Sequence, residues 1–229
     1  MVLTMTSRAS SAFLALLSEE DRAAFEVLGR LRRYDPGRVL ILEGEHVGHV
    51  LLLLDGRVKV TSMTADGREL LLSVCGPGEL MGELAALGGE RQPCSATVTT
   101  LDLVRAQVVP TKEFLDYVER HPKALLILTR AIIERLRAAD RRRLEFGSYD
   151  APGRVARLLV EMAEEHGRAT VAGIEIGLPL SQEELAGLIT ASRESVARSL
   201  TSLRRRGLIT TGRRSVTVCD MDALRRLAV

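Results

Sequence analysis

Aromatic residues are scarce in this sequence, and tryptophan is absent. Aromatics make up 3% of the 229 residues, and none follows Tyr149. Proteins that bind single-stranded nucleic acid commonly stack the bases on aromatic side chains. The last third of the chain lacks such side chains, which argues against a single-strand binding platform there.

Cysteine is also scarce, and its spacing argues against several kinds of site. Cys75, Cys94 and Cys219 lie far apart, and no Cys-x-x-Cys pair occurs. This arrangement supports neither a disulfide framework, nor a cysteine zinc site, nor a four-cysteine iron–sulfur site. The four histidines show no metal-binding spacing on a helix. We therefore expect no metal centre.

Long apolar runs and common catalytic motifs are missing as well. No apolar run reaches the roughly 20 residues that span a bilayer, and the first eight residues do not resemble a secretory signal. We expect a cytoplasmic protein without a membrane partner. The sequence contains no Gly-x-Ser-x-Gly elbow, no phosphate-binding loop and no His-Glu-x-x-His motif, so we expect no enzyme.

The first half of the chain has the pattern of a strand-rich domain. Apolar residues at helical spacing predict a helix over residues 11–31. From residue 34 to about 110, Gly-containing turns separate short β-prone runs, which is typical of an antiparallel sandwich or barrel. The expected strands are 39–42, 50–54, 58–62, 69–74, 95–98 and 101–104.

A long helix is expected next. A short helix opens at Thr111, and His121-Pro122 begins a longer helix that ends near residue 147. Its apolar stripe comprises Leu125, Leu128, Ile132, Leu136, Ala139 and Phe146, widened by Leu126 and Ile133. The stripe fits two interpretations equally: packing on the helix's own domain, or a two-helix dimer seam. We interpret the arginines of the other face as solvated; they are Arg130, Arg135, Arg137, Arg141, Arg142 and Arg143.

The C-terminal third contains a helix-turn-helix pattern. Pro152-Gly153 marks a boundary, followed by an amphipathic helix over 155–165 and β-prone pieces within 170–180. Residues 181–206, SQEELAGLITASRESVARSLTSLRRR, form two predicted helices joined by Thr190-Ala191. Ser181 is expected to cap the first helix, which begins near Gln182, and Ser192 to cap the second.

Charge is concentrated in the same region. The whole chain has a formal net charge of +2, whereas residues 190–215 carry seven arginines and one acid, a net +6. The start of the second helix, where a recognition helix meets base edges, is polar: Arg193, Glu194, Ser195 and Arg198. Residues 208–218 predict a β-hairpin with Arg213 and Arg214 at its tip, placed for phosphates. These features together predict binding to duplex DNA.

Longer motifs connect the two halves. In the N-terminal half they are Asp35-Pro-Gly, Glu43-Gly-Glu, Leu54-Asp-Gly-Arg-Val-Lys-Val and Gly82-Glu-Leu. In the C-terminal half they are Asp150-Ala-Pro-Gly-Arg-Val-Ala-Arg, Gln182-Glu-Glu-Leu-Ala and Ser192-Arg-Glu-Ser-Val-Ala-Arg. With these motifs the chain resembles the cyclic-AMP receptor protein/Fnr (Crp/Fnr) family of bacterial transcription regulators, from about residue 11 to 225.

The resemblance implies an α+β architecture with three parts. An N-terminal antiparallel β-roll, similar to cyclic-nucleotide-binding domains, is expected over 1–121 as the effector sensor. A long dimerisation helix follows over 122–148, and a C-terminal winged helix-turn-helix over 149–229. The resemblance also implies a homodimer that contacts RNA polymerase or occludes a promoter, so activation and repression both stay open.

The resemblance further implies the DNA sequence and the residues that contact it. The expected target is a palindrome similar to GTGA-N6-TCAC, with base reading by Arg193, Glu194 and Arg198. The other expected DNA-binding residues are Ser181, Gln182, Ser192, Ser195, Arg213 and Arg214.

The expected effector pocket departs from the family pattern at its phosphate end. Gly82, Glu83 and Leu84 are intact, and the resemblance implies that Glu83 meets a ribose hydroxyl. Cys94 stands before Ser95, where the family has a phosphate-binding arginine, and a thiol cannot replace a guanidinium on a phosphate. The loop is one residue longer, so Arg91 is a candidate to take that place.

A second departure lies on the long helix. Ala139 and Asp140 align with the Thr-Ser pair that cyclic-AMP-binding members present to adenine. Alanine offers no hydrogen bond, and a carboxylate suits donors such as those of guanine. We favour an interhelical ion pair for Asp140. Both departures argue against tight cyclic-AMP binding.

Three hypotheses for the effector follow. The first is another small molecule in or near the β-roll, with a guanine nucleotide or a cyclic dinucleotide as candidates. The second is a dimer that binds DNA without an effector. The third is thiol sensing through Cys94 or Cys75, for which the sequence offers no activating partner. We expect a small-molecule effector that is not cyclic AMP bound in the usual way.

Overall fold

The structure, a computed structural model, describes residues 13–65, 67–89, 92–212 and 215–228, with only the backbone described at 142–143 and 145–148. The chain divides into two compact units, Met1–Arg135 and Leu136–Val229. The boundary falls inside α5 (Pro122–Ser148), the long helix predicted from the sequence. Among the described residues, no helix is long and apolar enough to cross a membrane.

The first unit begins with two short helices instead of the single predicted helix over 11–31. They are α1 (Phe13–Leu16) and α2 (Glu19–Glu26), and Ser18 caps α2 by accepting a hydrogen bond from the Asp21 amide. Gly29, at a φ of +60°, then turns the chain into strand β1 (Arg30–Tyr34). A Cβ on Gly29 would lie 2.1 Å from the Val108 carbonyl oxygen, so only glycine permits this approach. The helical prediction failed beyond residue 26 because pairing with a distant strand overrides local spacing.

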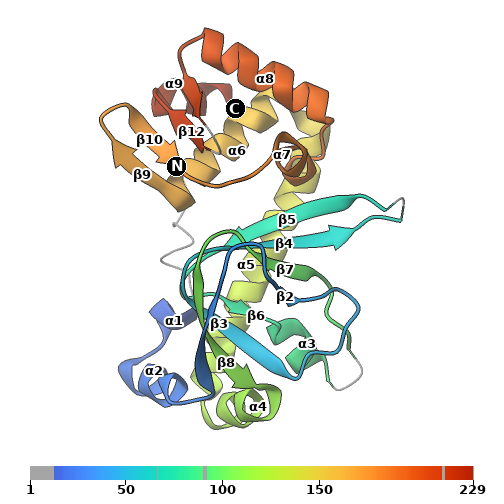
Figure 1. The fold of residues 1–229 in the computed structure, drawn as a ribbon, viewed down its shortest axis with the longest axis vertical. Coiled ribbons are helices and arrows are strands. Elements are labelled where there is room, and N and C mark those ends of the chain that lie inside the picture. The colour runs from blue at the N-terminus through green and yellow to red at the C-terminus, as the bar shows by residue number, and fades with distance from the viewer. Residues whose placement is uncertain (1–12, 66, 90–91, 213–214, 229) are drawn as a thin grey trace. The chain divides into compact units, whose positions relative to one another are not determined.

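Two four-stranded antiparallel sheets form the body of this unit (Figure 1), as the α+β β-roll prediction requires. The first has the order β1-β8-β3-β6, with β3 (His49–Asp55), β6 (Leu80–Met81) and β8 (Val104–Pro110). The second has the order β2-β7-β4-β5, with β2 (Val39–Ile41), β4 (Val58–Met63), β5 (Glu69–Cys75) and β7 (Thr97–Thr100). Helix α3 (Glu83–Gly88) follows β6, and α4 (Thr111–Arg120) follows β8.

Strand β3 is buried on both faces, which explains its continuous apolar sequence. Val50 and Leu52 join a core with α1, α2, α4 and the start of α5. Leu51 and Leu53 join a second core that contains residues of both sheets, among them Cys75, together with Cys94 from the segment before β7. The helices α1, α2 and α4 lie beside β3 and β8 in Figure 1.

A tight turn accounts for the Asp-Gly-Arg motif between β3 and β4. Gly56 has a φ of +77°, and a Cβ there would lie 2.3 Å from the Leu103 carbonyl oxygen. The Asp102 carboxylate accepts from the Arg57 amide at 2.6 Å and from Arg57 Nε at 2.8 Å. The Asp-Gly-Arg part of this family-like motif therefore has a structural role, which is to stabilise the turn between β3 and β4.

The apolar stripe of α5 divides between two faces. Leu128 is buried in the α-helical core of the first unit, and Leu125 and Ile132 pack against that core. Leu126, Ile133 and Leu136 remain 58%, 42% and 61% exposed. One face of α5 therefore packs on the helix's own unit, as one of the two interpretations predicted. A second apolar face remains exposed to solvent.

The second unit is a winged helix-turn-helix, as predicted. Its helices are α6 (Ala151–His166), α7 (Gln182–Leu188), α8 (Arg193–Arg205) and α9 (Met221–Leu227). The sheet has the order β11-β12-β10-β9, with β9 (Gly167–Thr170), β10 (Gly173–Ile176), β11 (Ile209–Gly212) and β12 (Ser215–Val218). Leu159, Val196 and Leu224 are among its buried residues.

Candidate DNA-reading head and effector site

A capping box fixes the start of α7. Ser181 Oγ accepts from the Glu184 amide at 3.1 Å, and the Glu184 carboxylate accepts from the Ser181 amide at 2.7 Å. Leu185 and Leu188 are buried on the other side of the helix. Ser181 and Gln182, two of the predicted DNA-contact residues, are exposed.

The turn between α7 and α8 contains a strained residue. Thr190 has a φ of 51°, and it is the one non-glycine residue with a positive φ in the described part of the chain. A β-branched residue is unfavourable in this left-handed region. The Ala191 amide donates to the Ala186 carbonyl at 3.0 Å, which closes the turn and holds Thr190 in place.

Helix α8 has the two faces expected of a recognition helix. Ser192 caps it by accepting from the Ser195 amide at 3.2 Å. Val196, Leu200 and Leu203 are buried against the unit, whereas the predicted base-reading residues Arg193, Glu194 and Arg198 are exposed. The amino-acid pattern and the tertiary structure therefore place the same three side chains at the surface.

Electrostatics at the start of α8 favour an ionised Glu194. The backbone amide at the helix start and the Ser192 hydroxyl lower the pKa of Glu194, with smaller effects from Arg193 and Arg198. A carboxylate is a hydrogen-bond acceptor only, which suits the amino group of cytosine.

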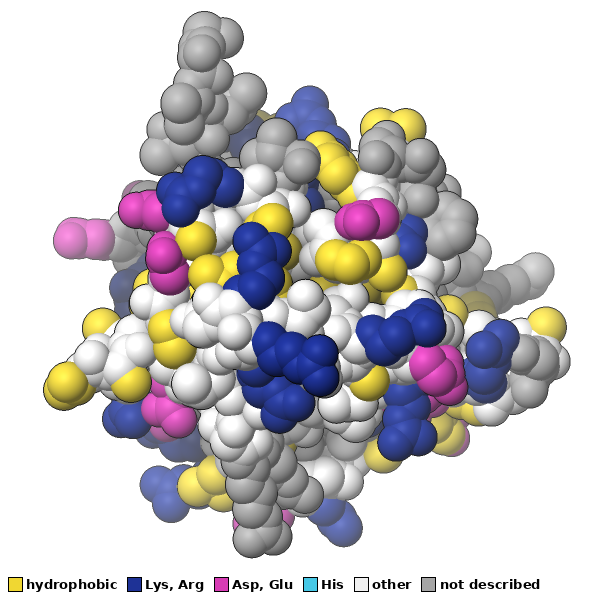
Figure 2. Space-filling view, turned by 90° about the horizontal axis from the view of Figure 1, so that it is seen from above, with side chains coloured by type: hydrophobic (Ala, Val, Ile, Leu, Met, Phe, Trp, Pro, Cys, Tyr) yellow, Lys and Arg dark blue, Asp and Glu magenta, His cyan; other side chains and the backbone are white. Residues whose placement is uncertain are grey.

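Further basic side chains belong to this unit. Arg204 Nη1 donates to Thr211 Oγ1 at 3.3 Å and so connects the end of α8 to β11. Figure 2 shows Lys and Arg side chains among neutral ones on the upper face of the unit, with fewer acidic groups between them. Arg213 and Arg214, predicted at the hairpin tip between β11 and β12, lie outside the described residues.

The predicted effector residues of the first unit have unequal environments. Gly82 has a φ of +86° and precedes α3. Leu84 is exposed and Glu83 is 2% exposed. Ser95 is exposed, and Arg91 lies outside the described residues.

Glu83 is paired within the protein. Its carboxylate forms an ion pair with Arg135 from α5. Burial raises the pKa of Glu83, and the Arg135 guanidinium opposes part of that rise. The interpretation of Arg135 as a solvated side chain was wrong, because its side chain is only 29% exposed. Sequence periodicity could not reveal this contact, because Glu83 and Arg135 belong to helices that lie far apart along the chain.

Cys94 lies in the core between the two sheets. Its amide donates to the Glu45 carbonyl at 2.8 Å, and its own carbonyl accepts from the Gly44 amide at 2.8 Å. Burial raises the pKa of the Cys94 thiol, which leaves it protonated and weakly nucleophilic at neutral pH. Ala139 and Asp140 belong to the second unit and are exposed on α5.

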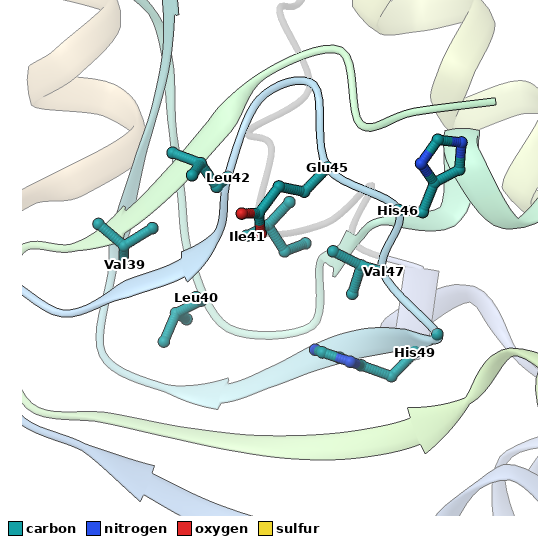
Figure 3. Close-up of a pocket in the computed structure, with 9 residues that line it drawn as sticks. Val39, Leu40, Ile41, Leu42, Glu45, His46, Val47 and His49 are labelled. Atoms are coloured by element: carbon teal, nitrogen blue, oxygen red, sulfur yellow. The ribbon is translucent and has the colours of Figure 1, made fainter.

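Strand β2 and the loop that follows it line an open hollow of about 400 Å³. Its lining comprises residues 39–42 and 45–49, and Figure 3 shows His46 directed away from His49. Burial and the nearby Arg32 lower the pKa of His49. None of the predicted effector residues that the structure describes lines this hollow. Among the described residues, no group of three His, Cys, Asp or Glu side chains could hold a metal ion.

Comparisons with known proteins agree with this architecture. Residues 31–121 match the family described as cyclic nucleotide-binding domain, and residues 153–227 match the Crp-like helix-turn-helix domain. A CRP-like cAMP-activated global transcriptional regulator of Mycobacterium tuberculosis is 31% identical over 192 residues, covering 84% of this chain and 85% of that protein. The chain belongs to the Crp/Fnr family. It is therefore a DNA-binding transcription regulator with a cyclic-nucleotide-binding domain.

Other members of the Crp/Fnr family extend the comparison. The cyclic AMP receptor protein of Thermus thermophilus is 28% identical and covers 96% of this chain and 98% of its own length. The solved structure of a CRP-family regulator from the same organism gives a TM-score of 0.71 at 28% identity, with 86% of this chain and 96% of that chain covered. The c-di-GMP-responsive regulator CLP of Xanthomonas campestris gives a TM-score of 0.76 at 22% identity, covering 89% and 100%, and supports the fold alone.

Proposed function

We propose that this Crp/Fnr family member is a homodimer that reads a palindrome similar to GTGA-N6-TCAC. The observation that carries the proposal is the exposed face of α8, which presents Arg193, Glu194 and Arg198 from a buried and capped helix. Arginine pairs with the O6 and N7 acceptors of guanine, and glutamate accepts from cytosine N4. Ser181, Gln182, Ser192 and Ser195 then contact the DNA around the reading side chains, and Arg213 and Arg214 neutralise phosphates.

The exposed face of α5 supports the homodimer. Leu126 and Ile133 are seven residues apart, and Leu136 follows three residues later, the a and d spacing of a two-helix seam. Asp140 is exposed on the same helix, and we assign to it an ion pair between the two helices.

We propose that a small-molecule effector, a cyclic mononucleotide or cyclic dinucleotide, acts through the β-roll, and that it does not bind as cyclic AMP usually does. The match to cyclic-nucleotide-binding domains supports the ligand class. The buried neutral thiol of Cys94 and the exposed Ala139 support the unusual pose, because neither supplies a charge or a hydrogen bond to the ligand. Gly82, Glu83, Leu84, Ser95, Arg91 and Asp140 complete the candidate set.

The alternatives are a regulator without an effector and one that senses thiol oxidation. The ion pair between Glu83 and Arg135 favours the first, because it satisfies the buried carboxylate without a ligand. The raised pKa of Cys94 counts against the second. We further propose that the protein acts in the cytoplasm as a non-enzymatic regulator that contacts RNA polymerase or occludes promoters, with the functional division 1–121, 122–148 and 149–229.

A mobility-shift titration with a GTGA-N6-TCAC duplex tests the central claim. Specific binding should exceed binding to a scrambled duplex by about a thousandfold or more and weaken steeply with salt. Equal affinity for both duplexes would refute sequence reading. Calorimetric titration with cyclic AMP, cyclic GMP and cyclic di-GMP tests the effector, and tight cyclic-AMP binding would contradict the interpretation of Cys94 and Ala139.

A further inference from the structure

Arg135 joins α5 to one short segment of the β-roll. Its Nη1 pairs with Glu83 Oε1, and its Nη2 donates to the Leu80 carbonyl at 3.3 Å. The same Nη2 lies 4.0 Å from Glu79 Oε1. All three partners lie within residues 79–83: Glu79 precedes β6, Leu80 belongs to β6, and Glu83 begins α3. One guanidinium therefore connects the first half of α5 to this segment at three points.

The contact with Glu83 is buried and costly to break. Glu83 is 2% exposed, and removing one partner of a buried ion pair leaves an uncompensated charge. A ligand hydroxyl that approached Glu83 would have to compete with a guanidinium that already forms a charge-assisted hydrogen bond. In the structure, Glu83 therefore serves the attachment of α5.

The charge around Arg135 is already balanced or negative. Burial opposes the protonated form of Arg135, but the carboxylates of Glu83 and Glu79 more than offset this effect and raise the pKa of Arg135. Among the described residues of this cluster, two carboxylates face a single cation. Arg135 is thus held by the protein's own acids and is not an open receptor for an anion.

We propose that Arg135 is a positioning residue whose pair with Glu83 holds the first half of α5 on the β-roll without a ligand and thereby sets the ligand-free affinity for DNA. This inference rests on the proposed function, because α5 supplies the proposed dimer seam and continues into the unit that carries the helix-turn-helix. An effector then changes DNA binding only through a difference in affinity between the paired and unpaired states.

A double-mutant cycle on DNA affinity tests the proposal in the full-length protein without added nucleotide. Glu83→Gln and Arg135→Met should each weaken binding to the GTGA palindrome by about fivefold or more, within the range usual for coupling between sites. The double variant should be no weaker than the weaker single variant, because both changes remove one contact. Arg135→Lys keeps the charge and should retain most of the affinity.

Two control variants separate this effect from loss of charge alone. Arg130→Met removes an exposed arginine from the same helix, and Glu26→Gln breaks the exposed pair between Arg22 and Glu26. Both should bind DNA like the unmodified protein. Weakening by Arg130→Met equal to that of Arg135→Met would overturn the proposal.

Hydrogen exchange gives a readout that does not depend on DNA. Backbone amides of residues 128–138 should exchange faster in Arg135→Met and Glu83→Gln, and Arg135→Lys should stay protected. If Arg135→Met does not fold, the proposal is tested by comparing the exchange rates of Glu83→Gln and Arg135→Lys, of which only Glu83→Gln should exchange faster. Unchanged exchange, or variants that lose only a response to added cyclic AMP, would overturn the proposal. If the unmodified protein reads no palindrome, the proposed function fails, while exchange still tests the attachment of α5.

Discussion

The Ser195 hydroxyl accepts a hydrogen bond from Arg198 Nη2 at 3.3 Å on the exposed side of α8. The same hydroxyl lies 3.0 Å from Ser192 Oγ, the cap of the helix. A proposed base-reading guanidinium is thus tethered to the cap through one serine. Because Arg198 is already held in place, it should lose less side-chain entropy when it binds DNA.

Replacement of Arg193 or Arg198 by alanine should weaken binding to the palindrome by roughly 1–3 kcal/mol and relax specificity at a single base pair. The cause is the loss of paired hydrogen bonds to one base. Competition mobility shifts with every single-base variant of the half-site measure both effects. Arg204→Ala, which removes a side chain bonded to Thr211, is the matched control and should leave base preference unchanged. Uniform loss over all sequences would make the tested arginine a phosphate contact.

Thr190→Gly should stabilise the second unit. Thr190 has a φ of 51°, a left-handed backbone conformation that is strained for a residue with a Cβ. Glycine has no Cβ and adopts this conformation without strain, so the free energy of unfolding should rise by about 1 kcal/mol. Calorimetric unfolding of the full chain should show a higher midpoint for the transition of that unit. Thr190→Ala keeps a Cβ and should gain much less. Equal midpoints for the alanine and glycine variants would show that backbone strain is not the cause.

Ile133→Asp should dissociate the proposed dimer. It places a carboxylate in the exposed apolar face of α5, where burial against a second copy would cost several kcal/mol. Sedimentation or native mass spectrometry should show monomers at concentrations where the unmodified protein is dimeric. Leu103→Asp is the control, because Leu103 is similarly exposed but lies outside α5. A dimer that survives Ile133→Asp would place the seam elsewhere.

The three thiols should react at two distinct rates. Cys219 is exposed, whereas Cys75 and Cys94 are buried, and burial raises the pKa of Cys94. A thiol-specific reagent near pH 7 should modify one site per chain rapidly in the native protein. Cys219→Ser should remove that fast phase. Rapid modification of Cys94 would revive the thiol-sensing alternative.

Glu43 should make the first unit sensitive to acid. Its carboxylate accepts from Ser62 Oγ at 2.6 Å and from the Met63 amide at 2.9 Å, and these bonds lower its pKa. Because the pKa of Glu43 is lower in the folded protein than in the unfolded chain, where it is about 4.3, the ionised carboxylate stabilises the fold at pH values above about 4.3. This contribution is lost as the pH falls through the pKa of the folded state. The difference in urea midpoint between the unmodified protein and Glu43→Gln should therefore shrink from pH 6 to pH 3. Glu119→Gln, at an exposed site on α4, should show no such trend.

The recognition helix shows how much local sequence can predict. Ser192, the buried spacing of Val196, Leu200 and Leu203, and the following hairpin all lie within one short segment. Caps and helical periodicity depend on neighbours along the chain, so their prediction needs no knowledge of distant contacts. The family-like motifs extended the prediction to the β-roll and its sheets.

Strand β1 and helix α3 show where local sequence was insufficient. Leu31 continues a helical apolar spacing, but pairing with β8 makes this segment a strand. Helix α3 is short and was not predicted, although its first residue, Glu83, was a candidate effector ligand. In both places the energy that decides the structure comes from segments far away in the chain.

The sequence by itself determined the kind of protein: a capped, basic helix-turn-helix behind a strand-rich sensor and a long helix. Those features are encoded in turn residues, caps and periodicity. Only the tertiary structure decided which face of α5 is covered by its own unit, and that Arg135 lies against a buried Glu83. The physical reason is that burial and desolvation depend on what packs against a side chain, and the packing partners of α5 lie dozens of residues earlier in the chain.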